Sequence, residues 1–282
     1  MMALPDPLGP RLIAMLMVLP GCGDGGAVSE DSGGDLPPPS YPLTLSFHYG
    51  LTWTVLNSRP CSRLSEHLDI GEESSSTYGY DGDRLVHTLS VDDSGDTIFE
   101  SELRYDSAGL LQDEDVFRVT GSVDGEPTHE TFTRAYFWEG GRLARLQSGD
   151  DYELEYGYDA GGELTELLKF DASGSLATVT SFTYWSPGVL RRVDADSEAD
   201  GSINYRYSFD LDDGGVPYRL VYESLDSGGE LTWFYVFQGD DLVTVEEAFR
   251  GGSKTDAMYE NDYGYTIEDR TTYEYGTCGA SW

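Results

Sequence analysis

Four acidic side chains within one short segment could bind a metal ion. Asp194, Asp196, Glu198 and Asp200 occupy alternate positions, and Gly201 follows them. Carboxylate oxygens are the ligands that Ca²⁺ prefers in proteins. The segment lacks the later ligand spacing of an EF-hand loop, and aspartates also cap hairpin turns without any metal. The segment therefore supports two interpretations: a calcium site, or a turn that aspartate caps.

Three tryptophans could bind a ligand by stacking. Trp138, Trp185 and Trp233 lie in runs whose composition is typical of β-strands. If the sheet leaves one face in water, their rings could stack on sugar rings or receive a partner peptide. The alternative is cross-strand stabilisation, which contributes about 0.2–1 kcal/mol per aromatic pair.

No catalytic motif stands out. The four histidines, His48, His67, His87 and His129, have no zinc-ligand spacing, and there is no Gly-x-Ser-x-Gly elbow or glycine-rich phosphate loop. We therefore predict a protein that is not an enzyme. The alternative is an enzyme acting on envelope polysaccharide, which needs two carboxylates about 5–10 Å apart in a cleft.

Any such site would have to be positioned by β-strands. The runs 97–105, 203–209 and 231–237 alternate apolar with polar residues and are rich in β-branched and aromatic side chains. Clusters of Asp, Gly and Ser separate these runs and are typical of hairpin turns. From residue 41 onward no segment reads as a helix, so the sequence predicts an all-β domain.

A weak repeat accompanies the hairpins. An aromatic residue, an acidic turn with glycine and then leucine recur, most clearly over Tyr156-Gly157-Tyr158-Asp159-Ala160-Gly161-Gly162-Glu163-Leu164. Similar segments begin at Tyr78, Leu103 and Tyr136, and more degenerate ones follow. We expect each aromatic and leucine to stack on those of the next hairpin, and each aspartate to cap its turn.

Over roughly residues 75–245 this pattern resembles the YD-repeat (Rhs-type) family. The resemblance implies long β-sheets, so we expect an elongated antiparallel meander or spiral of hairpins without significant helix. Large Rhs proteins are toxin carriers with a self-cleaving core. This chain is too short to enclose a cargo and lacks their Asp-Pro-rich cleavage segment, so only the sheet architecture carries over.

The N-terminus reads as a targeting segment. Arg11 precedes a short apolar run, and Leu19-Pro20-Gly21-Cys22 resembles the bacterial lipobox, in which the cysteine is acylated. Residues 1–21 are then a signal peptide, residues 22–40 a flexible tether rich in Gly, Ser, Asp and Pro, and residues 41–282 the β-hairpin domain. The alternative is an ordinary secretory signal. By resemblance to lipoprotein sorting, Gly23 favours the outer membrane.

If Cys22 carries lipid, two cysteines remain. In an oxidising compartment Cys61 and Cys278 most simply form a disulfide, and the alternative is two buried free thiols.

The charge of the chain excludes one class of partner. A formal net charge of -35 at pH 7 repels nucleic acid phosphates. The sequence therefore predicts a lipid-anchored, non-catalytic scaffold or binding protein of the cell envelope. Its expected partners are the membrane, through the anchor, and a glycan or protein at the cell surface. It needs no cofactor unless calcium stabilises an adhesion or glycan-binding module.

Overall fold

The computed structural model describes residues 60–68, 71–82, 84–123, 126–149, 151–186, 189–213, 217–238, 241–248 and 258–275. This part of the chain contains strands and turns but no helix, as the sequence predicts. Accordingly, no helix in these ranges is long and apolar enough to cross a membrane. The predicted signal peptide, Cys22, the tether and Cys278 lie outside the described residues.

The chain forms a meander of antiparallel strands. Their bounds are β1 (Pro60–His67), β2 (Glu72–Asp81), β3 (Arg84–Asp92), β4 (Thr97–Tyr105), β5 (Leu111–Val123), β6 (Glu126–Glu139), β7 (Arg142–Ser148), β8 (Tyr152–Tyr158), β9 (Leu164–Asp171), β10 (Leu176–Ser186), β11 (Val189–Asp196), β12 (Tyr205–Leu211), β13 (Pro217–Ser224), β14 (Glu230–Gln238), β15 (Asp241–Ala248), β16 (Tyr259–Glu260) and β17 (Thr266–Tyr275). The predicted run 97–105 is β4. The run 203–209 begins two residues before β12, and the run 231–237 lies within β14.

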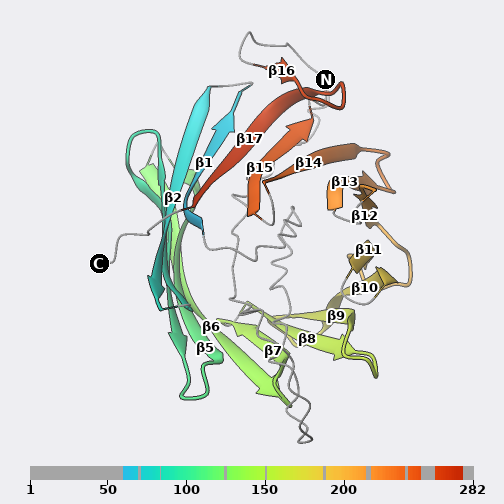
Figure 1. Ribbon diagram of the computed structural model, residues 1–282. Coiled ribbons are helices and arrows are strands. Elements are labelled where there is room, and N and C mark those ends of the chain that lie inside the picture. The colour runs from blue at the N-terminus through green and yellow to red at the C-terminus, as the bar shows by residue number, and fades with distance from the viewer. Residues whose placement is uncertain are drawn as a thin grey trace, which may run out of the picture.

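The sheet closes on itself, so the expectation of an elongated open meander or spiral was wrong. β1 pairs with β2 on one side and with β17 on the other, and β17 also pairs with β15. All strands except the short β16 therefore form one barrel. In Figure 1 they follow one another around a ring until β17, in red, returns beside β1. Closure removes the two long exposed edges that an open sheet would present.

The two faces of the barrel differ sharply in composition. On β8, Leu154 and Tyr156 are buried, whereas Glu155 is exposed. The convex face of an isolated barrel meets solvent, so the buried side chains face the lumen. This inner wall carries a continuous apolar cluster with contributions from strands β2–β14 and β17. The alternate side chains form the outer wall.

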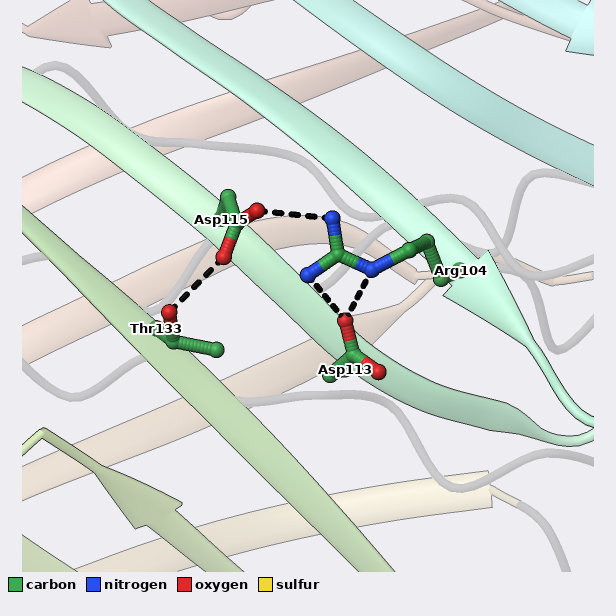
Figure 2. A network of polar contacts seen from close by, with 4 residues as sticks. All are labelled: Arg104, Asp113, Asp115 and Thr133. Atoms are coloured by element: carbon green, nitrogen blue, oxygen red, sulfur yellow. Dashed lines mark hydrogen bonds and ion pairs between the residues drawn. The ribbon is translucent and has the colours of Figure 1, made fainter.

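Charged networks cross the outer wall. Arg104 on β4 bonds to Asp113 and, at 2.7 Å, to Asp115 on β5, and Thr133 on β6 donates to Asp115 at 2.7 Å. Figure 2 shows these four side chains meeting across three neighbouring strands. Charged side chains therefore join neighbouring strands on the outer wall.

Aspartates cap the turns, as the sequence predicts. Asp106 Oδ1 accepts hydrogen bonds from the backbone N–H groups of Ala108 at 2.8 Å and Leu110 at 2.9 Å. Asp92, Asp171 and Asn261 accept the same pair of bonds in their own turns. Asparagine can therefore replace aspartate in this cap, because the cap needs an acceptor oxygen rather than a charge.

Successive hairpins are joined by a ladder of aromatic side chains. The residue before each turn pairs with the leucine after it across a β-bulge, as in Tyr158 opposite Leu164. Its polar tip then reaches the backbone carbonyl of the leucine in the preceding hairpin. The bonds are Tyr105 to Leu85 at 2.7 Å, Trp138 to Leu111 at 2.7 Å, Tyr158 to Leu143 at 2.9 Å and Tyr184 to Leu164 at 2.8 Å. The repeat thus encodes contacts between hairpins.

Arginine and glycine complete the contact between hairpins. The Arg142 guanidinium lies over the Tyr158 ring of the next hairpin, 5.6 Å from its centroid. It also fills the space where Gly162 would carry a Cβ. Gly162 has a φ of 94°, a backbone conformation that L side chains rarely adopt. Glycine is needed here for both its conformation and its size.

We predict that Gly162→Ala destabilises the protein more than Gly174→Ala. Gly174 also has a positive φ, 77°, but a Cβ there would meet nothing within 4 Å. Its alanine variant should lose about 1–2 kcal/mol from backbone strain alone. The Gly162 variant adds displacement of Arg142, which Arg142→Ala should relieve. Urea unfolding of the three single variants and the double variant measures this coupling, and equal losses at the two glycines would contradict it.

Candidate functional site

A buried polar cluster lies on the inner wall of β5 and β6. Glu114 faces Arg134 across the two strands and is 0% exposed. One of its oxygens, Oε2, accepts hydrogen bonds from Arg134 Nη1 at 3.2 Å and from Tyr136 OH at 2.9 Å. A buried charge pair costs desolvation free energy that packing alone does not return. Such a cluster within an apolar wall is therefore a candidate binding site.

Several polar atoms of this cluster have no partner. Glu114 Oε1 and Arg134 Nε make no hydrogen bond, and neither do Ser148 Oγ on β7 and Tyr156 OH on β8. Ser148 faces Arg134 across the strands. Leaving a buried polar group unpaired costs about 1–3 kcal/mol. Four such atoms on four adjacent strands thus form an incomplete hydrogen-bonding surface.

The polar strip continues along the neighbouring strands. Thr88 on β3 and Ser101 on β4 face each other, are almost fully buried, and have hydroxyl groups without a partner. Farther along, Arg63 donates to Ser76 at 3.1 Å, and Ser76 and Ser90 share a hydrogen bond of 2.8 Å. Hydroxyl side chains therefore extend the Glu114 cluster toward β1.

Burial fixes the protonation of this cluster. It raises the pKa of the Tyr136 phenol, and the Glu114 carboxylate raises it further. Burial also raises the pKa of Tyr156. Burial opposes the charge on Arg134, but the Glu114 carboxylate together with the Tyr136 and Tyr152 phenols outweighs that effect, so the pKa of Arg134 lies above its usual value. At neutral pH both phenols keep their protons and Arg134 keeps its charge, so all three can donate hydrogen bonds.

The residues of the predicted calcium site make other contacts. Asp194 lies on the outer wall, accepts a hydrogen bond from Arg206 Nε at 2.7 Å and pairs with Arg192. Asp196 caps the following turn by accepting from three backbone N–H groups, those of Glu198, Asp200 and Gly201. Glu198 and Asp200 are exposed. Asp196 thus acts as the turn cap that the second interpretation of this segment predicts. Calcium binding stays a prediction.

A different group of carboxylates comes together at the seam of the barrel. Within the described ranges, Glu247, Glu268 and Asp269 place ligand atoms within 4.8 Å of one another. Trp233 donates to Glu247 at 2.9 Å, and His67 Nδ1 lies 2.8 Å from Asp269. The sequence does not indicate this group, because its members meet only when β15 and β17 pair.

The three predicted stacking tryptophans do not share a face. Trp138 and Trp233 are partly buried and pack on the inner apolar cluster. Trp185 is 53% exposed, and the Arg191 guanidinium lies 4.4 Å from its ring centroid. The structure therefore does not bring these rings into one platform, and a stacking role for any of them stays a prediction.

One hollow of about 720 Å³ lies beside Trp138. Its lining includes Phe137, whose ring is covered by Arg145 at 4.0 Å. Asp106, Glu139 and Glu155 add carboxylates to this lining. Because Arg145 occupies the ring face, the hollow is a weaker candidate than the inner-wall cluster.

Of the two predicted disulfide partners, Cys61 lies near the start of β1, at one end of the seam. Its neighbour Pro60 faces Tyr275 at the end of β17. Cys278 follows Tyr275 by three positions but lies outside the described residues. The pairing of Cys61 with Cys278 therefore stays a prediction that the strand register favours.

Comparisons with known proteins name no family. No family model matches the chain, and no curated protein matches it. A solved porin-like protein from Bacteroides uniformis is similar at 12% identity and a TM-score of 0.39, covering 75% of this chain and 95% of that one. A TcdB2-TccC3-TEV structure has 8% identity and a TM-score of 0.21 over 70% of this chain.

The Photorhabdus luminescens Tc holotoxin pore has 9% identity and a TM-score of 0.22 over 73% of this chain. The matched segments span only 15% and 14% of these two toxin chains.

We predict that acid weakens the wild type more than an Asp171→Asn variant. Hydrogen bonds from Ser173 and Ser175 lower the pKa of Asp171 below its usual value. This contribution is complete above about pH 4, the unfolded pKa, and is lost as the pH falls through the lower folded pKa. Asparagine keeps the cap, as Asn261 shows, but cannot titrate.

Thermal melts between pH 6 and pH 2 measure this effect as the difference between the two proteins. The wild-type advantage should shrink on acidification, and a constant difference would contradict the assignment. Asp171→Ala, which removes both the charge and the cap, should be less stable than Asp171→Asn at every pH.

We also predict that reductant lowers the melting temperature. A bridge between Cys61 and Cys278 would close a loop of over two hundred residues, for which the chain-entropy model gives roughly 5 kcal/mol as an upper value. Cys278→Ser should melt like the reduced wild type, whereas Cys22→Ser should remain sensitive to reductant. An intact mass that shows free thiols at Cys61 and Cys278 in the oxidised protein would rule the bridge out.

Proposed function

We propose that the protein is a non-catalytic, lipid-anchored binding protein of the cell envelope. In this proposal the inner wall of its barrel holds a neutral, hydroxyl-rich ligand such as a sugar. The observation that carries the proposal is the set of unpaired, buried polar atoms on Glu114, Arg134, Ser148 and Tyr156. Native proteins rarely leave such atoms without partners, so each of them calls for an explanation.

The chemistry of these atoms selects the ligand class. Glu114 can only accept hydrogen bonds, Arg134 can only donate them, and the Ser148 and Tyr156 hydroxyls do both. A hydroxyl group of a ligand also donates and accepts, so one such molecule can satisfy all four side chains. Glu114 and Arg134 cancel each other's charge. A site whose two charges balance favours a neutral ligand, and the net charge of -35 in addition disfavours anionic ones.

Tyrosine rings beside the cluster suit the same ligand. Tyr136 and Tyr156 belong to the inner apolar cluster, and Tyr152 packs against it. Aromatic rings give a flat apolar surface together with a polar tip. Because the unpaired atoms lie out of reach of solvent, a ligand can enter only after local opening of the lumen. We therefore expect slow association.

The proposed anchor would orient the barrel. The tether of residues 22–40 precedes Pro60 in the sequence, and Pro60 lies at the rim that also carries the repeat turns. The opposite rim would then point away from the membrane. Its turns are acidic and include Asp92, Asp171 and Asp196.

We predict opposite effects for two tyrosine variants. Tyr156→Phe removes a hydroxyl group without a partner, so stability should hold or rise while ligand binding falls at least tenfold. Tyr158→Phe removes the bond to the Leu143 carbonyl, so stability should fall by about 1–3 kcal/mol. Its ligand affinity should be unchanged, because Tyr158 lies at the rim.

Equilibrium dialysis with neutral monosaccharides and disaccharides measures binding however slowly the sugar enters, and urea unfolding measures stability. The proposal fails if no sugar of the panel binds the wild type, or if Tyr156→Phe binds as the wild type does. Hydrolysis of any of the sugars would instead favour the polysaccharide-active enzyme.

A further inference from the structure

The chain covers many of its aromatic rings with its own cations. Arg145 lies over Phe137 at 4.0 Å, and Arg191 lies over Trp185 at 4.4 Å. Further pairs include Arg270 over Tyr259, Lys169 over Tyr152 and Arg84 over Tyr105. A cation over a ring face is attracted by the negative charge of that face. Exposed rings without such a cation are therefore distinctive in this protein.

One exposed group of rings on the outer wall has this property. The Tyr263 ring stacks on Phe234 of β14, with centroids 5.0 Å apart, and the Tyr265 ring lies 4.8 Å from Phe234. The Tyr218 ring of β13 lies 5.3 Å from Tyr263. Phe234 is fully buried beneath them, whereas Tyr263 is 49% and Tyr265 39% exposed. We call Tyr218, Tyr263 and Tyr265 the tyrosine platform.

The platform is held rigidly on the barrel. Asn261 Oδ1 accepts hydrogen bonds from the backbone N–H groups of Tyr263 and Tyr265, both at 3.1 Å. Asn261 Nδ2 in turn donates to Glu246 on β15 at 3.1 Å, and Tyr259 donates to the same carboxylate at 2.6 Å. The turn that carries the two exposed rings is therefore fastened to the wall at two points, which fixes the rings before any partner arrives.

Carboxylates surround the platform. Asp262 and Asp212 are exposed, and both act on the Tyr263 phenol electrostatically, as do Glu246 and the Tyr218 phenol. Arg219 lies opposite Phe234 across the strands, but its guanidinium pairs with Asp210 and does not lie over a ring. Across the described ranges, no Lys or Arg lies over Tyr263 or Tyr265. The site combines open ring faces with negative charge.

We propose that the tyrosine platform docks an arginine side chain from a basic segment of a partner protein. The partner's guanidinium would lie over Tyr263 or Tyr265, as Arg191 lies over Trp185, with Asp262 as its ion-pair partner and Asp212 adding negative charge nearby. The net charge of -35 adds long-range attraction for such a segment. Guanidinium is favoured over ammonium because it is planar and stacks on rings. This inference is independent of the ligand on the inner wall.

A matched pair of peptides tests the docking of arginine on the full chain. The first is acetyl-Arg-Gly-Arg-Gly-Arg amide, and the second carries citrulline, which is neutral but of nearly the same shape, in place of arginine. Titrations followed by NMR of ring-labelled tyrosine should show the arginine peptide binding at least tenfold more tightly. Its affinity should fall as salt rises. Equal affinity for the two peptides would overturn the proposal.

Substitutions at the platform and at Trp185 test where the arginine peptide binds. Tyr263→Leu with Tyr265→Leu should weaken the arginine peptide at least tenfold, whereas Trp185→Leu, whose ring already carries Arg191, should not change its affinity. If removing the tyrosines unfolds the turn, Asp212→Asn with Asp262→Asn keeps the rings and should still weaken binding several-fold. Equal losses in the Trp185 variant and the platform variants would mean non-specific attraction to an acidic surface and would refute the site.

Two other ligands complete the test. Phosphatidylcholine vesicles offer a cationic headgroup, and a neutral disaccharide offers a ring for stacking without charge. Binding of either one to the platform in place of the arginine peptide would overturn the assignment to a basic protein segment.

Discussion

The pairing of β1 with β17 is the constraint on which the barrel depends. Ser65 and Thr271 share a hydrogen bond across this seam although they are 206 residues apart in the chain. Ser62 donates to Glu274, and Arg270 donates to Glu66, so the seam is held by polar side chains as well as by the backbone. Without the seam there would be no lumen, and the inner polar cluster would face water on an open sheet. The neighbouring hairpins could still form, because their contacts are local.

Closure also gives the two walls their different chemistry. The inner wall collects leucine and tyrosine around the buried Glu114–Arg134 pair, whereas the outer wall carries ion pairs such as Arg145 with Glu153. The register of the closed sheet therefore decides which side chains are buried in the lumen and which form ion pairs on the outer wall.

Much of the local structure could be predicted from the sequence. Alternation over 97–105 specifies a strand, and the turn aspartates and the aromatic–leucine pairs behave as the repeat predicts. These features are predictable because each depends on residues within one hairpin or the next. Closure of the barrel cannot be predicted in this way, because β1 and β17 are far apart in the sequence and nothing in either strand specifies the other as its partner.

The candidate site shows the same limit. Asp113, Glu114 and Asp115 read as one acidic stretch, yet only Glu114 faces the lumen. Glu114 lies two positions before the buried Val116 on β5 and opposite the buried Leu103 on β4, and this alternation could have indicated that Glu114 points inward. That Arg134 is its partner depends on the register between β5 and β6. The tyrosine platform likewise forms only because the turn before β17 folds back over β13 and β14. No local sequence pattern predicts that contact.

The order in which the strands leave the ribosome or an export channel has a consequence for the seam. β1 emerges first and finds its second neighbour, β17, only after every other strand has emerged. Until then its backbone N–H and C=O groups line an open edge, the kind of edge at which chains aggregate or exchange strands. Contacts so distant in sequence also form slowly. Safe production of this barrel therefore favours a chain that is kept apart from its copies, or held by a chaperone, until its last strand arrives.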